Sequence, residues 1–438
     1  MSKQFYLRRK QGKAVSSTNI KIKAERKIDE YVALYQEEHQ DDESDYETPS
    51  STSSARIYRL DRKDRDQDVQ DACQIYEPTL KLLFESKCKK TGIPTFAMTY
   101  LMDQIAVGYP ELSLRNHGIG PTGMVSVVNQ LMGNRTVKKL DLSQNDIQAE
   151  GTITLVKLLR RNQTITDLNI SENNIGKKGM ETISNWLVNN GSIKRLNLSR
   201  NNLTSEDIVF FTTVMQADDI IEVLDLSHNK FDGKAGVHLG GIIQSNTTLS
   251  KLNFGWNYLG DEGVIEISKA MKSNGTLEKL DLCWNEISDV STHEISQALR
   301  LNSCLQELDL SHNLISDKGM ENIAWGLESN STLKTFRIGF NLLSAAGACC
   351  LLRSLLKNLR TGLETVNFAE AEASTEFEKL FWRLKLKKPR FNVLDMHSSS
   401  GGDCVFVLKP WDSLHVLETY LQNNNLNDFS EPNVEDSD

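Results

Sequence analysis

One repeated pattern limits the possible folds of this 438-residue chain more than any other feature. A six-residue motif related to Leu-x-Leu-Ser-x-Asn occurs eight times, each 28 residues after the previous one, without an insertion. The motifs end at Asn145, Asn173, Asn201, Asn229, Asn257, Asn285, Asn313 and Asn341. One period earlier, LSLRNHGI has His117 in place of the asparagine. A constant period of this length indicates an array of stacked supersecondary units.

Two other residue types recur with the same step. An asparagine precedes each motif, with one aspartate as the exception, in the series Asn134, Asn162, Asn190, Asp218, Asn246, Asn274, Asn302 and Asn330. A glycine follows each motif at Gly123, Gly151, Gly179, Gly263, Gly319 and Gly347, with Asp207, Ala235 and Ser291 as departures. Apolar residues after it, such as Leu155, Leu158 and Leu159, predict one apolar helical face. By this spacing Trp186 and Trp325 are predicted to lie in the core.

Each unit therefore reads as a short strand, an asparagine turn and a helix of about three turns. Alternation predicts that Leu140 and Leu142 point inward while Lys139, Asp141 and Ser143 point outward. The asparagines, which carry both a donor and an acceptor, are expected to satisfy the backbone groups of the bends between coils. Those that match N-x-[ST] are interpreted as structural caps rather than glycan acceptors. The expected fold is an α/β solenoid, a horseshoe with a parallel concave sheet and outer helices.

These motifs resemble the ribonuclease-inhibitor class of leucine-rich repeats over about residues 110–360. Within the class, the chain is similar to the family of leucine-rich repeat-containing protein 74, through YEPTLKLLF before the array, the LSxN and WN strand endings, and GLETVNF…FEKLFWRL after it. That family is described only as repeat proteins, so the resemblance implies the fold and no particular biochemistry.

The composition outside the array predicts the domain organisation. Residues 1–74 are expected to be a disordered charged arm, because a basic block through Lys27 is followed by an acidic run and a Ser/Thr segment, Thr48 to Ser54. Residues 75–109 are interpreted as an N-terminal helical cap, 110–361 as about nine repeats, 362–427 as a C-terminal cap, and 428–438 as an acidic tail.

Composition and motifs also exclude several classes of function. The balance of 50 Lys+Arg against 59 Asp+Glu argues against a nucleic-acid binder. No apolar run is long enough for membrane insertion, and the basic N-terminus lacks the apolar segment of a secretory signal. The seven cysteines show no metal or redox spacing, which suggests a cytoplasmic location. Catalytic motifs are missing, and neither Asp225-Leu-Ser227-His228 nor Asp309-Leu-Ser311-His312 supplies obvious triad geometry. No enzyme activity, cofactor or metal is therefore expected.

The column just before each motif asparagine carries the main functional signal. It reads Gln144, Glu172, Arg200, His228, Trp256, Trp284, His312 and Phe340, and is therefore aromatic over its last five repeats. Strand geometry places these residues at the lip of the concave face, stacked about 5 Å apart. The small residues Gly255 and Cys283 leave room beside the tryptophans. Such a stripe either packs for structural reasons or forms a binding hot spot.

The leading hypothesis is a non-catalytic scaffold that binds a protein partner on the concave face. Trp256, Trp284 and Phe340, with His228 and His312, would anchor the partner, while Asp281, Asp309, Lys251 and Lys279 would set its register. Acids beside bases suit a protein surface better than a polyanion. One alternative is a GTPase-activating protein, because Ran GTPase-activating proteins resemble this chain in repeat type. The other is an axonemal or cytoskeletal assembly component.

Overall fold

The strand-turn-helix unit expected from the 28-residue period is present throughout the array. The computed structural model describes residues 95–358, 360–369, 371–394 and 397–398. The chain divides into two units, Met1–Asn257 and Tyr258–Asp438, and each is considered by itself. The expected arm (1–74), the first part of the N-terminal cap, the end of the C-terminal cap and the acidic tail lie outside the described residues.

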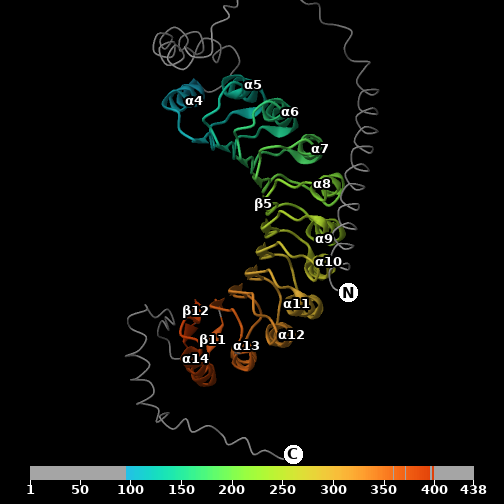
Figure 1. Ribbon diagram of the computed structural model, residues 1–438, viewed down its shortest axis with the longest axis vertical. Coiled ribbons are helices and arrows are strands. Elements are labelled where there is room, and N and C mark those ends of the chain that lie inside the picture. The colour runs from blue at the N-terminus through green and yellow to red at the C-terminus, as the bar shows by residue number, and fades with distance from the viewer. Residues whose placement is uncertain (1–94, 359, 370, 395–396, 399–438) are drawn as a thin grey trace, which may run out of the picture. The chain divides into compact units, whose positions relative to one another are not determined.

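The first unit contains six parallel strands that pair in sequence order (Figure 1). Neighbouring strands are in register at a separation of 28 residues, as in Leu112↔Leu140 and Leu140↔Leu168. Its elements are α4 (Thr95–Val107), β1 (Glu111–Ser113), α5 (Gly120–Leu131), β2 (Lys139–Asp141), α6 (Gln148–Leu159), β3 (Asp167–Asn169), α7 (Gly176–Leu187), β4 (Arg195–Asn197), α8 (Ile208–Met215), β5 (Val223–Asp225), α9 (Ala235–Ser245) and β6 (Lys251–Asn253).

The second unit continues the same architecture. Strands β7, β8, β9, β10 and β12 pair in that order, all parallel. A short parallel pair, β11 with β13, lies outside this sheet. Its elements are α10 (Gly260–Met271), β7 (Lys279–Asp281), α11 (Asp289–Leu301), β8 (Glu307–Asp309), α12 (Asp317–Leu327), β9 (Thr335–Arg337), α13 (Ala345–Lys357), β10 (Thr365–Asn367), β11 (Glu372–Ala373), α14 (Thr375–Lys387), β12 (Asn392–Leu394) and β13 (His397–Ser398). The segment interpreted as a closing cap therefore adds two more strands to the sheet.

The motif asparagines form a buried ladder, which confirms the role expected for them. Asn173 Nδ2 donates to the carbonyl of Leu142 in the preceding coil at 2.9 Å, and its Oδ1 accepts from the backbone N–H of Asn145 at 3.0 Å. Asn201 and Asn313 repeat the first of these contacts at Ile170 and Leu282. Each amide thus links one turn to the next where water is excluded.

The asparagines that precede the strands form a second ladder. Asn246 Nδ2 donates to Met215 O at 2.8 Å, and Asn330 Nδ2 donates to Leu299 O at 2.7 Å. Asn162 and Asn330 are only 4% and 3% exposed, so their capping role is confirmed. Asn358, the residue directly after α13, continues this ladder by donating to Leu327 O at 2.9 Å.

The glycine column reflects the close approach of successive helices. A Cβ at Gly319 or Gly347 would lie 2.3 Å from Oδ1 of Asp289 or Asp317, which come from the previous helix. Asp317 Oδ1 accepts the backbone N–H of Gly347 at 3.1 Å. Ser291, a departure from the column, keeps the same contact, since its backbone N–H donates to Asp261 Oδ1 at 3.2 Å, and its hydroxyl adds a second bond to that oxygen at 2.6 Å. The glycines are therefore required by packing.

Two orientation predictions are wrong. Ser143 was expected to point outward, but it is 2% exposed, because the chain turns sharply at the next residue and folds over it. Trp325 was expected in the core, as Trp186 is at 3% exposure, but it is 42% exposed. Its indole lies beneath the guanidinium of Arg300 on the preceding helix, with 3.9 Å from Cζ to the ring centroid. A cation–π contact on the helical surface thus replaces burial.

Candidate binding surfaces

The residue before each motif asparagine adopts a left-handed backbone. Eight non-glycine residues share φ values of 53–61°: Gln144, Glu172, Arg200, His228, Trp256, Trp284, His312 and Phe340. We call this set the turn row. A hydrogen bond to the next coil holds the conformation, as in His312 N to Gly339 O at 2.9 Å and Phe340 N to Ala369 O at 2.8 Å. The bend places the asparagine inward and leaves the turn-row side chain at the surface.

In the first unit the turn row is a chain of side-chain contacts. Gln144 Nε2 donates to Glu172 Oε2 at 3.0 Å, and the Glu172 carboxylate lies 3.7 Å from Nε of Arg200. Arg200 Nη2 is 3.1 Å from His228 Nε2, and the His228 ring stacks on Trp256 with 4.8 Å between centroids. Burial and the neighbouring Arg200 lower the pKa of His228. Trp256, at the end of this chain, is 45% exposed.

In the second unit the turn row is entirely aromatic. His312 lies between Trp284 and Phe340, with ring centroids 4.5 and 4.1 Å apart and planes within 14°. Trp284 is 41% and Phe340 44% exposed. Leu314 and Leu342, each two residues further along their turns, are also exposed. The stacking expected within this part of the column is confirmed.

The acids proposed to set the register have structural contacts of their own. Asp281 Oδ1 accepts the backbone N–H of Cys283 at 2.9 Å, and Asp309 Oδ1 accepts the N–H of Ser311 at 2.9 Å. The same Asx contact ends the strands at Asp141, Asn169, Asn197, Asp225 and Asn253. These residue types are therefore explained by the turn. Asp309 also lies 3.9 Å from Arg337. Sequence reasoning missed this signal, which is an Asp or Asn two residues before the Ser, Gly or Cys of each turn.

The two lysines proposed together with these acids, Lys251 and Lys279, differ in their surroundings. Lys279 forms an ion pair with Glu307 on the next strand, whereas Lys251 is exposed at the start of β6. The contribution of all four charged residues to partner binding stays a prediction.

The Asp, Ser and His neighbours do not form a triad. Ser311 Oγ donates to Asp309 Oδ1 at 2.5 Å, while the His312 ring is stacked between two aromatic rings. A nucleophile needs its base within hydrogen-bond distance, and here the hydroxyl is directed at the carboxylate. Burial, with Asp281 and Asp309 nearby, strongly raises the pKa of the Cys283 thiol, so it is not an activated nucleophile.

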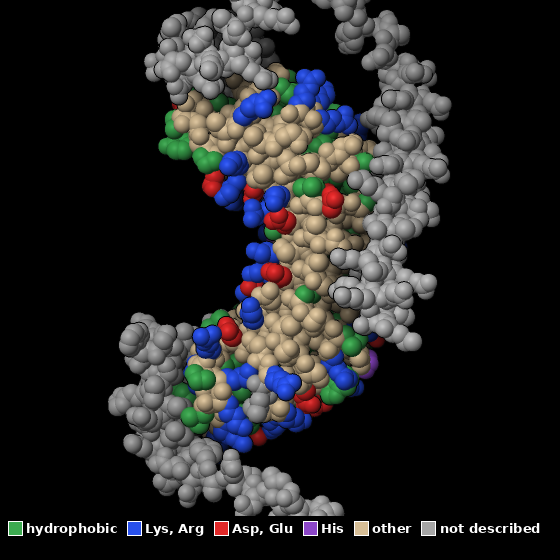
Figure 2. Space-filling model, viewed as in Figure 1, with side chains coloured by type: hydrophobic (Ala, Val, Ile, Leu, Met, Phe, Trp, Pro, Cys, Tyr) green, Lys and Arg blue, Asp and Glu red, His purple; other side chains and the backbone are tan. Residues whose placement is uncertain are grey.

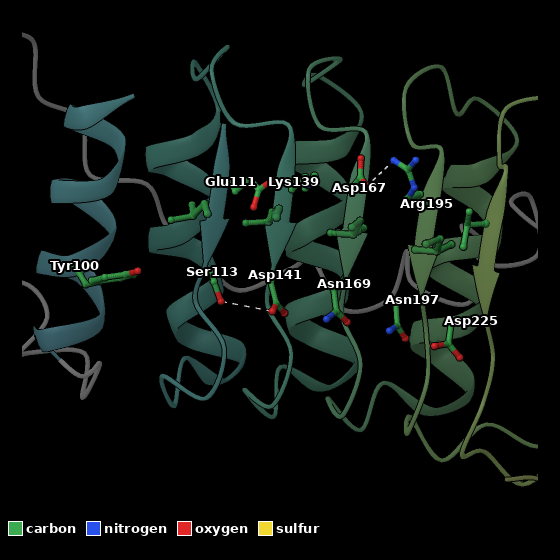
Figure 3. A pocket seen from close by; sticks show the side chains of 15 residues that line it. Tyr100, Glu111, Ser113, Lys139, Asp141, Asp167, Asn169, Arg195, Asn197 and Asp225 are labelled. Atoms are coloured by element: carbon green, nitrogen blue, oxygen red, sulfur yellow. Dashed lines mark hydrogen bonds and ion pairs between the residues drawn. The ribbon is translucent and has the colours of Figure 1, made fainter. Parts of the chain in front are cut away.

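A pocket of about 520 Å³ lies on the strand face of the first unit (Figure 3). One row of its lining contains Glu111, Lys139, Asp167 and Arg195, and a second contains Ser113, Asp141, Asn169, Asn197 and Asp225. Tyr100 on α4 forms a wall beside β1 (Figure 3). Figure 2 shows Lys and Arg side chains beside Asp and Glu along the strand edge. The 28-residue period predicts these two rows, but only the placement of α4 shows that they are enclosed at one end.

Within the described ranges, no group of three or more His, Cys, Asp or Glu side chains is placed to hold a metal ion. No helix in the same ranges has the length and hydropathy needed to cross a membrane. The four cysteines that the structure describes, Cys283, Cys304, Cys349 and Cys350, are thiols.

One comparison with known proteins, a scan for protein families, agrees with this geometry. The family model described as "Leucine Rich repeat" matches residues 133–156, 161–184, 189–211, 245–268 and 301–324. The fold is accordingly that of a leucine-rich repeat solenoid, and repeats of this kind generally mediate protein–protein interactions. No curated protein matches the sequence significantly.

Solved structures with some similarity include the leucine-rich repeat-containing protein LegL7 from Legionella pneumophila, at 20% identity and a TM-score of 0.44, covering 74% of this chain and 99% of that one. Another is leiomodin-1 actin-binding site 2, at 22% identity and a TM-score of 0.25, covering 30% and 75%. A TDR receptor matches at 16% identity and a TM-score of 0.37, covering 63% and 45%. TM-scores this low say nothing about function.

Proposed function

We propose that this protein is a non-catalytic scaffold that binds a protein partner on the strand side of its repeats, in the cytoplasm. The observation that carries the proposal is the aromatic part of the turn row. Trp284 and Phe340 are more than 40% exposed and are held rigid by stacking on His312. Rigid exposed aromatic side chains are typical anchors of protein interfaces.

The backbone gives an independent reason to assign a role to these side chains. A left-handed φ suits glycine and costs a β-carbon-bearing residue on the order of 1 kcal/mol. Trp284, His312 and Phe340 all adopt it, at 54–55°. The turn alone would be formed more easily by glycine, so the aromatic side chains are not needed to make the bend. Anchoring a partner supplies a reason for their presence.

The test is capture of partners from native lysate by the full chain and by the double variant Trp284→Ala/Phe340→Ala. Val290→Ala is the matched control, since Val290 is 68% exposed in the same unit at the start of α11. We expect the double variant to lose specific partners that the control retains, with both variants folded by circular dichroism. The same partners on both variants would contradict the proposal.

We also propose that the chain is related to the family of leucine-rich repeat-containing protein 74, on the basis of the sequence segments that flank the repeats. GTPase activation and axonemal assembly have no specific observation in their favour among the described residues. They are decided by a GTP-hydrolysis assay with small GTPases and by localisation in ciliated and unciliated cells.

A further inference from the structure

Among the residues that the structure describes, helices cover only one side of the sheet in the first unit. The leucines of its strands, such as Leu112, Leu140 and Leu168, are at most 3% exposed, because the helices pack against their side of the sheet. The opposite side carries the polar rows of the pocket, with Tyr100 at one end (Figure 3). This uncovered side is chemically distinct from the aromatic turn row of the second unit.

Charge in the pocket on this face is unbalanced toward acid. Four carboxylates line the pocket against two cations, Glu111, Asp141, Asp167 and Asp225 against Lys139 and Arg195, while the exposed Lys251 on β6 lies outside it. Each cation already has a partner, since Lys139 pairs with Glu111, and Arg195 Nη1 lies 2.9 Å from Asp167 Oδ1. Among the residues that the structure describes, Asp141 and Asp225 form no ion pair. A ligand that complements this face therefore brings positive charge.

The two unmatched carboxylates are held in fixed orientations. Asp141 Oδ1 accepts the N–H of Ser143 at 3.0 Å, and Asp225 Oδ1 accepts the N–H of Ser227 at 2.9 Å. Asp141 Oδ2 also receives the Ser113 hydroxyl at 3.5 Å. Preorganised acceptors lose little freedom when a cation binds, and this favours affinity. Asn169 and Asn197 occupy the two equivalent positions between them.

The strand spacing sets the spacing of the ligand. Asp141 on β2 and Asp225 on β5 are three strands apart, about 14 Å at about 4.8 Å per strand. An extended polypeptide covers about 13 Å in four residues. We propose that this face binds an extended segment of a protein partner in which two Lys or Arg residues are four positions apart, lying across β2–β5. This inference rests on the proposed scaffold function and names the chemistry of the bound segment.

The test uses the full chain and three labelled peptides in fluorescence anisotropy at low ionic strength. The first peptide is Gly-Ser-rich with two Arg residues four positions apart, the second has Glu at the same positions, and the third has the two Arg residues adjacent. We expect the first to bind most tightly. The variants Asp141→Asn and Asp225→Asn, which keep the Asx contact that Asn169 and Asn197 make, should each weaken it about three- to fivefold.

A reciprocal variant makes the test independent of loss of folding. Asn197→Asp also keeps the Asx contact but adds a carboxylate, so it should tighten the binding of the first peptide by a similar factor. Equal affinity for the three peptides, or affinity that none of these substitutions changes, would overturn the inference. Trp284→Ala/Phe340→Ala should leave peptide binding unchanged, so the failure of one proposal is distinguishable from the failure of the other.

The chain's own N-terminal segment is the competing occupant, since residues 1–27 contain nine Lys or Arg against Glu25 alone. In the full chain, substitution of Arg8, Arg9 and Lys10 by Gln should leave peptide affinity unchanged. A marked increase would show that this segment occupies the face, and would overturn the assignment to a partner.

Discussion

Trp284, His312 and Phe340 share a backbone conformation that their side chains disfavour, and the surrounding coil holds them in it. Their N–H groups donate to carbonyls of the next coil, as Trp284 N does to Ser311 O at 3.2 Å. In the first repeat Asn116 takes the left-handed position at φ 55°, and His117 Nδ1 lies 2.7 Å from Arg115 O, in place of the usual asparagine contact. The turn therefore accepts several kinds of side chain, so the residue type at this position can be selected for binding.

His228 allows a prediction on pH dependence. Burial and Arg200 lower its pKa below the ordinary value of about 6.5. Between the lowered folded-state pKa and about 6.5 the unfolded chain binds more protons, so the free energy of unfolding should fall as the pH falls through this window. Arg200→Gln removes one of the two causes and should raise the His228 pKa, as measured by NMR titration of the imidazole. A lower or unchanged pKa would contradict the account.

Asp218 is the exception in the second asparagine ladder, and its substitution by asparagine should stabilise the protein. Its Oδ1 accepts the N–H groups of Ile220 and Ile221, but burial raises its pKa and a carboxylate has no amide to donate. Asp218→Asn should raise the free energy of unfolding by about 1 kcal/mol at neutral pH.

The raised pKa of Asp218 destabilises the fold only at pH values where this carboxyl is ionised in the unfolded chain. The stability gained by Asp218→Asn should therefore shrink as the pH falls toward 4. Urea denaturation at both pH values measures it. Asp219→Asn, at the exposed neighbouring position, is the control and should have little effect.

At the scale of elements, consecutive helices of the second unit are joined by Asp–Ser pairs. Asp261 accepts from the hydroxyls of Ser288 and Ser291, with 2.6 Å to Ser291 Oγ. Burial works against ionisation of Asp261, but these hydrogen bonds outweigh it and lower its pKa. Asp289 accepts from Ser316 in the same way. The serines also cap α11 and α12, because Ser288 accepts from Val290 N and Ser316 from Lys318 N.

A double-mutant cycle on Asp289 and Ser316 tests this coupling. Each single change to Ala should lower the free energy of unfolding by about 1–2 kcal/mol, through the lost cap and the hydrogen bond to a charged group. The double variant should lose less than the sum, by about 1 kcal/mol, because both singles remove the same contact. Strict additivity in thermal or urea unfolding would show that the pair is not coupled.

Sequence periodicity was sufficient for the elements that repeat and insufficient for those set by single close approaches. The 28-residue step predicted the strands, both asparagine ladders and the turn row, because each depends on residues that become neighbours once coils stack. It did not predict the burial of Ser143, which depends on the left-handed turn, or the exposure of Trp325, which depends on Arg300. Residues 363–368 carry no motif asparagine, so their pairing with β9 was not evident. The pocket needed the position of Tyr100, which no periodicity gives.

At the scale of the whole molecule, stability should be the sum of contacts between adjacent coils within each unit. Asn173→Ala removes a fully buried amide that bonds to Leu142 O and Asn145 N, and should cost about 2–3 kcal/mol. Hydrogen exchange should show the largest loss of protection in β2 and β3 and a smaller loss in β6 of the same unit. A uniform loss would indicate that the unit unfolds as one body.

The scaffold function is tested most directly by site-specific crosslinking. A photoreactive phenylalanine analogue at position 340 should crosslink a discrete partner protein, and the same analogue at Val290 on the helical side should not. Substitution of Trp284 by Ala in the same chain should reduce the yield at position 340 several-fold, because both rings stack on His312. Equal crosslinking at positions 340 and 290, or a yield at 340 that does not depend on Trp284, would contradict the account.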